Sequence, residues 1–487
     1  MNHSNWEAVI GLEIHVQLST NSKIFSASST AFGAEPNDQA NEIDLGLPGT
    51  LPAVNSGIFP KAIAFGICID ANISKTSRFD RKNYFYPDLP KGYQITQMEI
   101  PIVTNGKIEI KPITGGSKTI RINRAHLEED AGKSIHGLIP NMTGIDLNRA
   151  GIPLLEIVSE PDMRNAEEAE IYAKSIHQLV TYLSISDGNM AEGSFRCDAN
   201  VSVRNRGETV LGVRTETKNI NSFKFLKNAI NYEIDRQITI LESGAKVEQE
   251  TRLYDSVKNE TRPMRSKETA TDYRYFPEPD LLPVVLDEAY IEEIRLTLPE
   301  LPTQKKDRYS QDYDLNEEEV FFLSNDLDLA EYFEECVRLT GDAKQSANWL
   351  KGEMASRLSK HEITIREAPV SANNLSRIII RIADGTISSK IGKKIFSAIW
   401  ENNGMEVDHL IEEKNLSQVS DENELQMIVS EIIRNNPKQV KQFLDGKGKL
   451  LGYFVGLVMK ETSGKANPKQ LNELILKRLN SEKKTSP

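Results

Sequence analysis

Residues 10–18 read IGLEIHVQL, a regular alternation of apolar and polar side chains. Successive side chains of a β-strand point to opposite faces, so the apolar residues share one face, and Glu13, His15 and Gln17 share the other. Residues 195–204, FRCDANVSVR, alternate in the same way. The pattern predicts strands with one buried apolar face and one face that carries polar functional groups.

Short alternating segments broken by Gly, Pro and Asn continue to about residue 295, with helices predicted to begin after Asn165 and at Ser222. Beyond Pro299 the chain becomes rich in Glu, Leu, Lys and Asn with helical periodicity. We therefore predict an α+β protein with a mostly antiparallel N-terminal region. The predicted domains are 1–295, an all-α domain at 296–411, and a small α-helical tail domain at 412–487, set off by a polar stretch near 412–424.

Composition indicates a globular protein with several domains. The 487 residues are 39% hydrophobic and 27% charged, and no run approaches the roughly 18 apolar residues of a membrane helix. The first residues lack the pattern of a signal peptide, and Cys68, Cys197 and Cys336 form neither a disulfide framework nor a CxxC pair. We expect a cytoplasmic protein that does not bind membranes.

Charge is distributed unevenly along the chain. The formal net charge is −12, whereas residues 441–487 carry ten Lys or Arg and four Asp or Glu, a local excess of +6. This basic end is a candidate RNA-binding tail, and an ordinary solvated helix face is the alternative.

Several acids are candidates for a metal site. Glu13 and His15 share a strand face, Glu128 lies in HLEED at 126–130, and Glu156 interrupts the apolar run PLLEIV at 153–158. Carboxylates with at most one imidazole and no thiolate suit Mg²⁺ or Mn²⁺ better than a structural zinc ion. The alternative is that Glu13 and His15 face solvent or pair with Arg.

The polar faces of residues 195–204 and 213–219 are candidates for a charged cleft. Arg196, Asp198 and Lys218 lie on these faces, and cations beside a divalent ion suit phosphoryl transfer. A solvated face of an antiparallel sheet is the alternative. The sequence has no P-loop, no G-x-S-x-G elbow and no Ser-Lys amidase signature, so it predicts neither a P-loop ATP site nor a hydrolytic nucleophile.

Eight blocks of the sequence, together with the tail segment GKGKLLGYFVGLVMKETSGKANPKQLNELI at 446–475, resemble the B subunits of aspartyl/glutamyl-tRNA(Asn/Gln) amidotransferases, in the same order along nearly the whole chain. Residues of about 330–483 resemble the GatB/YqeY domain. The eight blocks are IGLEIHVQL (10–18), LGLPGTLPAVN (45–55), FDRKNYFYPDLPKGYQITQ (79–97), HLEEDAGKS (126–134), DLNRAGIPLLEIVSEPDM (146–163), GSFRCDANVSVR (193–204), TETKNINSF (215–223) and DYRYFPEPDLLP (272–283).

The resemblance implies an ATP-dependent ligase reaction on mischarged tRNA. The side-chain carboxylate of Glu on tRNA(Gln), or of Asp on tRNA(Asn), is phosphorylated and then amidated by ammonia. It also implies a heterotrimer, in which an amidase A subunit releases the ammonia from glutamine and a small C subunit joins the other two.

The resemblance also assigns residues to roles. It implies that Glu13, His15, Glu128 and Glu156 bind Mg²⁺. Among the catalytic residues, it implies that Lys82, Lys91 and Arg196 contact phosphate or carboxylate groups and that Asp198 is a polar position near ATP or the ammonia tunnel. It implies that Lys447, Lys449, Lys465 and Lys469 contact the tRNA backbone.

One departure from the family concerns zinc. Many members carry two cysteine pairs near the N-terminus, whereas this chain has Ser26 and Ser28 at the first pair and no cysteine before Cys68. No structural zinc is expected. Two alternatives to the enzyme remain, a non-catalytic tRNA-binding adaptor of the same fold and an amide ligase that acts on a small acid without tRNA.

Overall fold

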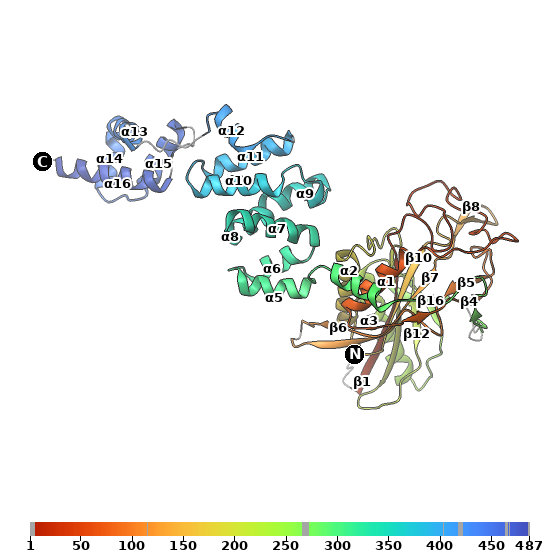
Figure 1. The fold of residues 1–487 in the computed structure, drawn as a ribbon. Helices are drawn as coiled ribbons and strands as arrows, with labels where there is room; N and C mark the ends of the chain where they lie inside the picture. Colours follow the sequence, from red (N-terminus) through yellow and green to blue (C-terminus); the bar gives the residue numbers. More distant parts are fainter. Residues whose placement is uncertain are drawn as a thin grey trace. The chain divides into compact units, whose positions relative to one another are not determined.

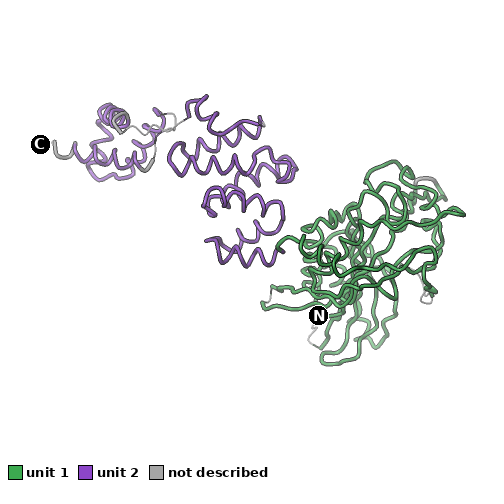
Figure 2. The backbone as a smooth tube through the Cα atoms, viewed as in Figure 1, with its two compact units in different colours: residues 1–300 green, residues 301–487 purple. Residues whose placement is uncertain are grey.

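The computed structural model describes residues 5–113, 115–264, 272–402, 404–416, 422–462, 466 and 468–485. Contacts between Cα atoms divide the chain into two compact units, residues 1–300 and 301–487 (Figure 2). Every strand among the described residues belongs to the first unit.

A nine-stranded sheet organises the first unit (Figure 1). Neighbouring strands are antiparallel except for β12 and β13, which are parallel. In spatial order the strands are β14 (Glu260–Pro263), β13 (Thr251–Asp255), β12 (Thr215–Lys218), β11 (Phe195–Asn205), β1 (Trp6–Gln17), β10 (Pro153–Ser159), β7 (Lys118–Glu129), β6 (Val103–Ile110) and β2 (Asn72–Ile73).

Smaller sheets accompany the large one. They comprise β15 (Phe276–Pro277), β4 (Asp80–Asn83) and β5 (Tyr93–Thr96); β16 (Val284–Val285) with β3 (Thr76–Ser77); and β8 (Lys133–Ile139) with β9 (Met142–Asp146). The strand β5 also packs against β7, so the three-stranded sheet is joined to the large sheet.

Three helices pack on the large sheet: α1 (Ile58–Cys68), α2 (Ala166–Tyr182) and α3 (Phe223–Glu242). The predicted helix starts are confirmed, since Asn165 and Ser222 each accept a hydrogen bond from the backbone N–H three residues ahead. The alternation in β1 is confirmed as well. Leu12, Ile14 and Val16 are buried, whereas the residues between them are partly exposed. Helix α4 (Glu288–Thr297) contacts α1 near the end of the unit.

The second unit consists of helices in the part of the chain that the structure describes. They are α5 (Pro302–Asp312), α6 (Glu317–Ser324), α7 (Leu327–Thr340), α8 (Ala343–Trp349), the π-helical turn η2 (Leu350–Met354), α9 (Ala355–His361), η3 (Ile365–Glu367), α10 (Ala372–Ala383), α11 (Ser389–Glu401), α12 (Val407–Glu413), α13 (Glu422–Asn435), α14 (Pro437–Leu444), α15 (Leu450–Glu461) and α16 (Pro468–Thr485).

The helices of the second unit enclose two apolar cores. One extends from Tyr309 to Ile411, and the other from Leu425 to Leu479. The α+β class predicted from the sequence is confirmed. Among the described residues no helix has the length and apolar character needed to cross a membrane.

Candidate metal centre

Strand pairing places the predicted polar residues in one row across the large sheet. His15 on β1 lies opposite Glu156 on β10 and opposite Arg196 on β11. Glu156 in turn lies opposite His126 on β7. Because residues at directly paired positions point to the same face, four strands contribute one continuous polar row.

Three residues of this region form a cluster suited to a metal ion. One ligand atom from each of His15, Glu128 and Glu156 lies within 4.8 Å of the others. The His15 Nε2 atom is 3.3 Å from Glu156 Oε2 and 3.8 Å from Glu128 Oε1. Two carboxylates and one imidazole are a donor set that Mg²⁺ or Mn²⁺ accepts, so the residues present fit the predicted ion.

The charged groups of the cluster are strongly coupled. Burial opposes the charged imidazolium of His15, but the negative charge and hydrogen bond of Glu156 outweigh it and raise the pKa of His15 to about 9. Burial would also raise the pKa of Glu156, yet His126 and His15 hold that pKa well below its usual value. Glu156 is therefore ionised at neutral pH and forms a carboxylate–imidazolium pair with His15, and a metal ion would have to displace the His15 proton in order to bind its ring nitrogen.

Glu13 lies outside this cluster. Its Oε1 accepts a hydrogen bond of 2.8 Å from Asn200 Nδ2. In the register of β1 and β11, Glu13 lies opposite Asp198. Burial, followed by the charge of Glu156, raises the pKa of Glu13. The structure thus brings together three of the four predicted ligands, and Glu13 flanks them.

His126 contacts the cluster and was not anticipated from the sequence. Its Nε2 atom is 3.5 Å from Glu156 Oε2 and 3.6 Å from Glu128 Oε2, and the side chain is buried. A signal was available, because His126 and Glu128 are two residues apart on one strand and therefore share a face.

Arg196 and Asp198 each contact an oppositely charged side chain on the polar face. Arg196 Nη2 donates to Asp130 Oδ2 at 2.8 Å, and Asp198 Oδ2 accepts from Lys218 Nζ at 2.6 Å. Despite burial, the charge of Asp130 raises the pKa of Arg196. Both predicted residues lie on β11 beside the cluster.

The two predicted lysines lie on the side of the cluster toward the three-stranded sheet. Lys91 Nζ contacts the carboxylate of Glu129, at 2.6 Å from Oε2. Lys82 Nζ lies 5.0 Å from the ring centroid of Tyr273. Burial opposes the charge of Lys82, but Glu128 and other nearby groups outweigh this and raise its pKa.

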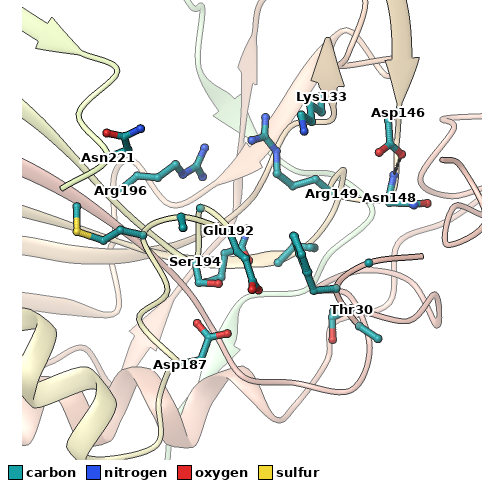
Figure 3. Close-up of a pocket in the computed structure, with 18 of the residues that line it drawn as sticks. Thr30, Lys133, Asp146, Asn148, Arg149, Asp187, Glu192, Ser194, Arg196 and Asn221 are labelled. Atoms are coloured by element: carbon teal, nitrogen blue, oxygen red, sulfur yellow. Dashed lines mark hydrogen bonds between the residues drawn. The ribbon is translucent and has the colours of Figure 1, made fainter. Parts of the chain in front are cut away.

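A pocket of about 580 Å³ adjoins the polar row. Its lining includes Lys133, Arg149, Arg196 and Asp198, and the volume is in the range of small-molecule sites. Figure 3 shows Arg149 and Arg196 extending toward the same part of the pocket. Both contact Asp130, with Arg149 Nε at 3.7 Å from Oδ2, so two guanidinium groups converge beside the candidate metal centre.

Ser26 and Ser28 lie in a hydrogen-bonded cluster around Asp44. Their hydroxyls donate to Asp44 Oδ1 at 2.8 Å and to Oδ2 at 2.7 Å, respectively. The Nζ atom of Lys23, which is fully buried, is 3.3 Å from Asp44 Oδ2. A buried ion pair and two hydroxyl donors thus join residues 23–28 to Asp44.

Of the predicted tail lysines, the structure describes Lys447 and Lys449 with their side chains, and both are exposed. Lys465 and the side chain of Lys469 lie outside the described residues.

These features define an α+β protein with a carboxylate–imidazole centre and an adjoining pocket that carries both basic and acidic side chains, followed by a helical region. The sequence-family model of the GatB/GatE catalytic domain matches residues 8–292, and the family model of the GatB domain matches residues 331–479.

Curated relatives are similar over nearly the full length. The chain is 56% identical to the B subunit of the aspartyl/glutamyl-tRNA(Asn/Gln) amidotransferase of Alkalilimnicola ehrlichii, covering 98% of this chain and 100% of that protein. The corresponding B subunit of Nitrosococcus oceani is also 56% identical, with 97% and 99% covered. The chain belongs to the family of aspartyl/glutamyl-tRNA(Asn/Gln) amidotransferase B subunits.

Proposed function

We propose that this chain activates the side-chain carboxylate of Glu on tRNA(Gln), or of Asp on tRNA(Asn), with ATP and Mg²⁺, and amidates it with ammonia. A carboxylate oxygen bonds to the γ-phosphorus as ADP leaves. Ammonia then attacks the carbonyl carbon of the acyl phosphate, and inorganic phosphate departs. Activation is required because an ionised carboxylate is a poor acceptor for an amine.

The observation that carries the proposal is the convergence of His15, Glu128 and Glu156 within 4.8 Å of one another, beside a pocket that contains two arginines. These three residues would hold Mg²⁺, which supplies charge neutralisation and orientation of phosphate oxygens when bound. That the reaction of this chain uses Mg²⁺ in this way is part of the proposal.

The pocket beside the centre suits the polyphosphate of ATP. Arg149 and Arg196 are permanently charged and present planar N–H donors, which favour phosphate oxygens. Lys133 adds a third cation to a lining that also holds four carboxylates, so the case for phosphate rests on the guanidinium donors and not on the net charge of the pocket. In this arrangement Arg196 on β11 and Arg149 just before β10 bind and orient the nucleotide beside the cluster.

The partners are part of the same proposal. The relatives' name describes one lettered subunit of an amidotransferase, and this chain carries no recognised hydrolytic nucleophile motif. Both observations support a heterotrimer in which an amidase A subunit supplies ammonia and a small C subunit completes the assembly. The tail beyond residue 412, with exposed Lys447 and Lys449, would bind the tRNA backbone. The reaction would take place in the cytoplasm, where the tRNA substrates are.

The test measures amide formation by the chain co-purified with the A and C subunits. Glu-tRNA(Gln) and Asp-tRNA(Asn) are supplied with ATP, Mg²⁺ and either glutamine or ammonium. We expect product with both nitrogen sources and release of one ADP per amide. Glu156→Gln should abolish turnover while tRNA affinity changes only a few-fold, because it removes one charged ligand atom from the centre.

The matched control is Glu168→Gln. Glu168 and Glu156 are both 8% exposed, but Glu168 lies in the first turn of α2 and pairs with Lys118. Normal turnover in Glu156→Gln, or equal losses in both variants, would remove Glu156 from the chemistry. Tight tRNA binding without product from either charged tRNA would instead support the adaptor.

A further inference from the structure

Two aromatic segments that are far apart in the sequence meet in the first unit. The segments are KNYFYP at 82–87 and DYRYFP at 272–277. Strand β4 pairs with β15, and Asn83 extends the junction by donating its backbone N–H to the Tyr273 carbonyl at 3.0 Å and its side-chain amide to the Arg274 carbonyl at 2.8 Å. The pairing therefore gathers the aromatic side chains of both segments.

The rings of Tyr84, Tyr86, Tyr273 and Tyr275 form a chain of contacts, and together with the exposed ring of Phe85, which lies between two of them in the sequence, they are called the aromatic surface below. The ring centroids of Tyr84 and Tyr86 are 6.1 Å apart, those of Tyr84 and Tyr273 are 6.1 Å apart, and those of Tyr273 and Tyr275 are 5.9 Å apart. Phe85 is 87% exposed and Tyr86 41% exposed. Burying such rings would normally be favourable, so an exposed group of them indicates a binding surface.

The aromatic surface is attached to the candidate metal centre. From β5, the partner of β4, Thr96 Oγ1 donates to Glu128 Oε2 at 3.1 Å, and the Ile95 N–H donates to Glu129 Oε1 at 2.8 Å. Lys82 lies between the surface and the centre, with its Nζ atom 5.0 Å from the Tyr273 ring and 5.9 Å from the Tyr84 ring. The negative charges of Glu128 and Glu156 attract its ammonium group.

The large sheet gives the centre two different flanks. The pocket with Arg149 and Arg196 lies where β1 ends and β10 and β11 begin, whereas β7 and the attached three-stranded sheet extend from the other side of β10. A reaction between a polyphosphate and an acyl group needs the two substrates to meet at the centre. The pocket presents two guanidinium groups, which suit phosphate oxygens, and the other flank is aromatic and suits an unpaired base.

We propose that the aromatic surface stacks the unpaired 3′-terminal nucleotides of the aminoacyl-tRNA. This inference rests on the proposed function, because the reacting carboxylate is joined through its amino acid to the terminal ribose. The terminal base must then lie within one amino-acid length of the centre. Aromatic side chains bind single-stranded bases by stacking, and every base has a face to offer.

The test uses tRNA in which the terminal adenine is replaced by 2-aminopurine, whose fluorescence falls when the base stacks. The tRNA is uncharged and is titrated with the complete complex of this chain and its partner subunits. We expect quenching with the unaltered complex and loss of quenching with Phe85→Ala, Tyr86→Ala and the double variant. Phe85→Tyr should retain it, because a stacking ring remains.

Kinetics identify which substrate the surface binds. In the alanine variants the KM for aminoacyl-tRNA should rise roughly 5- to 150-fold, the range for loss of one stacked base, with the KM for ATP unchanged. Phe321→Ala is the control, since Phe321 is an exposed phenylalanine on α6 of the other compact unit. It should alter neither constant.

Three results would overturn the proposal. A rise in the KM for ATP alone would mean that the surface binds the adenine of the nucleotide. Loss of a partner protein from the purified variant would mean that the surface is a protein interface. Unchanged quenching and unchanged KM values would mean that it binds no base. Quenching of uncharged tRNA requires no reaction, so a failure of the proposed chemistry is distinguished from a failure of stacking.

Discussion

Replacing Asp44 with Ala tests the buried cluster that contains Ser26 and Ser28. Asp44 accepts hydrogen bonds from both hydroxyls and pairs with Lys23, which is fully buried. Loss of one partner from a buried ion pair costs about 3–5 kcal/mol, because the remaining charge stays desolvated. Burial already lowers the pKa of Lys23, so the charged form of this amine depends on the nearby carboxylate of Asp44. For a unit of this size the cost corresponds to a fall in Tm of about 5–8 °C.

The assay is thermal unfolding of the chain, followed by circular dichroism with and without a chelator. Adding Lys23→Met to Asp44→Ala removes the unpaired charge and should restore at least half of the lost stability. A chelator should leave the Tm of the unaltered chain unchanged if the ion pair, rather than a metal, connects this segment. A loss below about 1 kcal/mol in the single variant would refute the reasoning, because surface ion pairs have that value.

Two further predictions concern other parts of the chain. Burial would raise the pKa of Glu233, but hydrogen bonds from Arg236 and Thr261 lower it, so its ionised form stabilises the fold above the usual Glu pKa and loses this effect as the pH falls. Glu233→Gln should therefore reduce the free energy of unfolding at pH 7, and urea titrations should show the difference shrinking below about pH 4; a difference independent of pH would exclude ionisation as its cause. Deleting residues 412–487 should weaken tRNA binding in a filter assay and spare glutamine hydrolysis by the partner amidase, whereas unchanged tRNA affinity would exclude the assigned role of the tail.

Local patterns in the sequence predict the elements that local chemistry determines. Alternation predicts β1 and β11, and the side chains of Asn165 and Ser222 predict where α2 and α3 begin, because a cap satisfies backbone N–H groups within three residues. The polar identity of the sheet face follows from the same alternation. The alternation does not predict which residues of different strands lie opposite one another, because register depends on the packing of the whole sheet.

The candidate site illustrates this limit. The register puts His126 on β7 opposite Glu156, a neighbour that the sequence pattern did not reveal. Glu13, the fourth ligand implied by the resemblance, lies opposite Asp198 and accepts a hydrogen bond from Asn200. The pairing of Lys91 with Glu129 likewise joins β7 to a residue just before β5. A sequence pattern shows that each residue is polar and faces a given side, but the partner of its charge is set by a strand that can be a hundred residues away.

The aromatic surface depends on the same long-range pairing, and this explains why neither of its segments is informative alone. Tyr84 and Tyr86 are followed by Pro87, and Tyr275 by Phe276 and Pro277, so each segment by itself reads as a turn with exposed rings. Only the junction of β4 with β15 makes the rings neighbours, and only the hydrogen bond from Thr96 to Glu128 connects that junction to the centre. A substitution at Asn83 that keeps the strand but removes its side-chain donor should therefore weaken base stacking without touching any ring, since Asn83 joins the two segments.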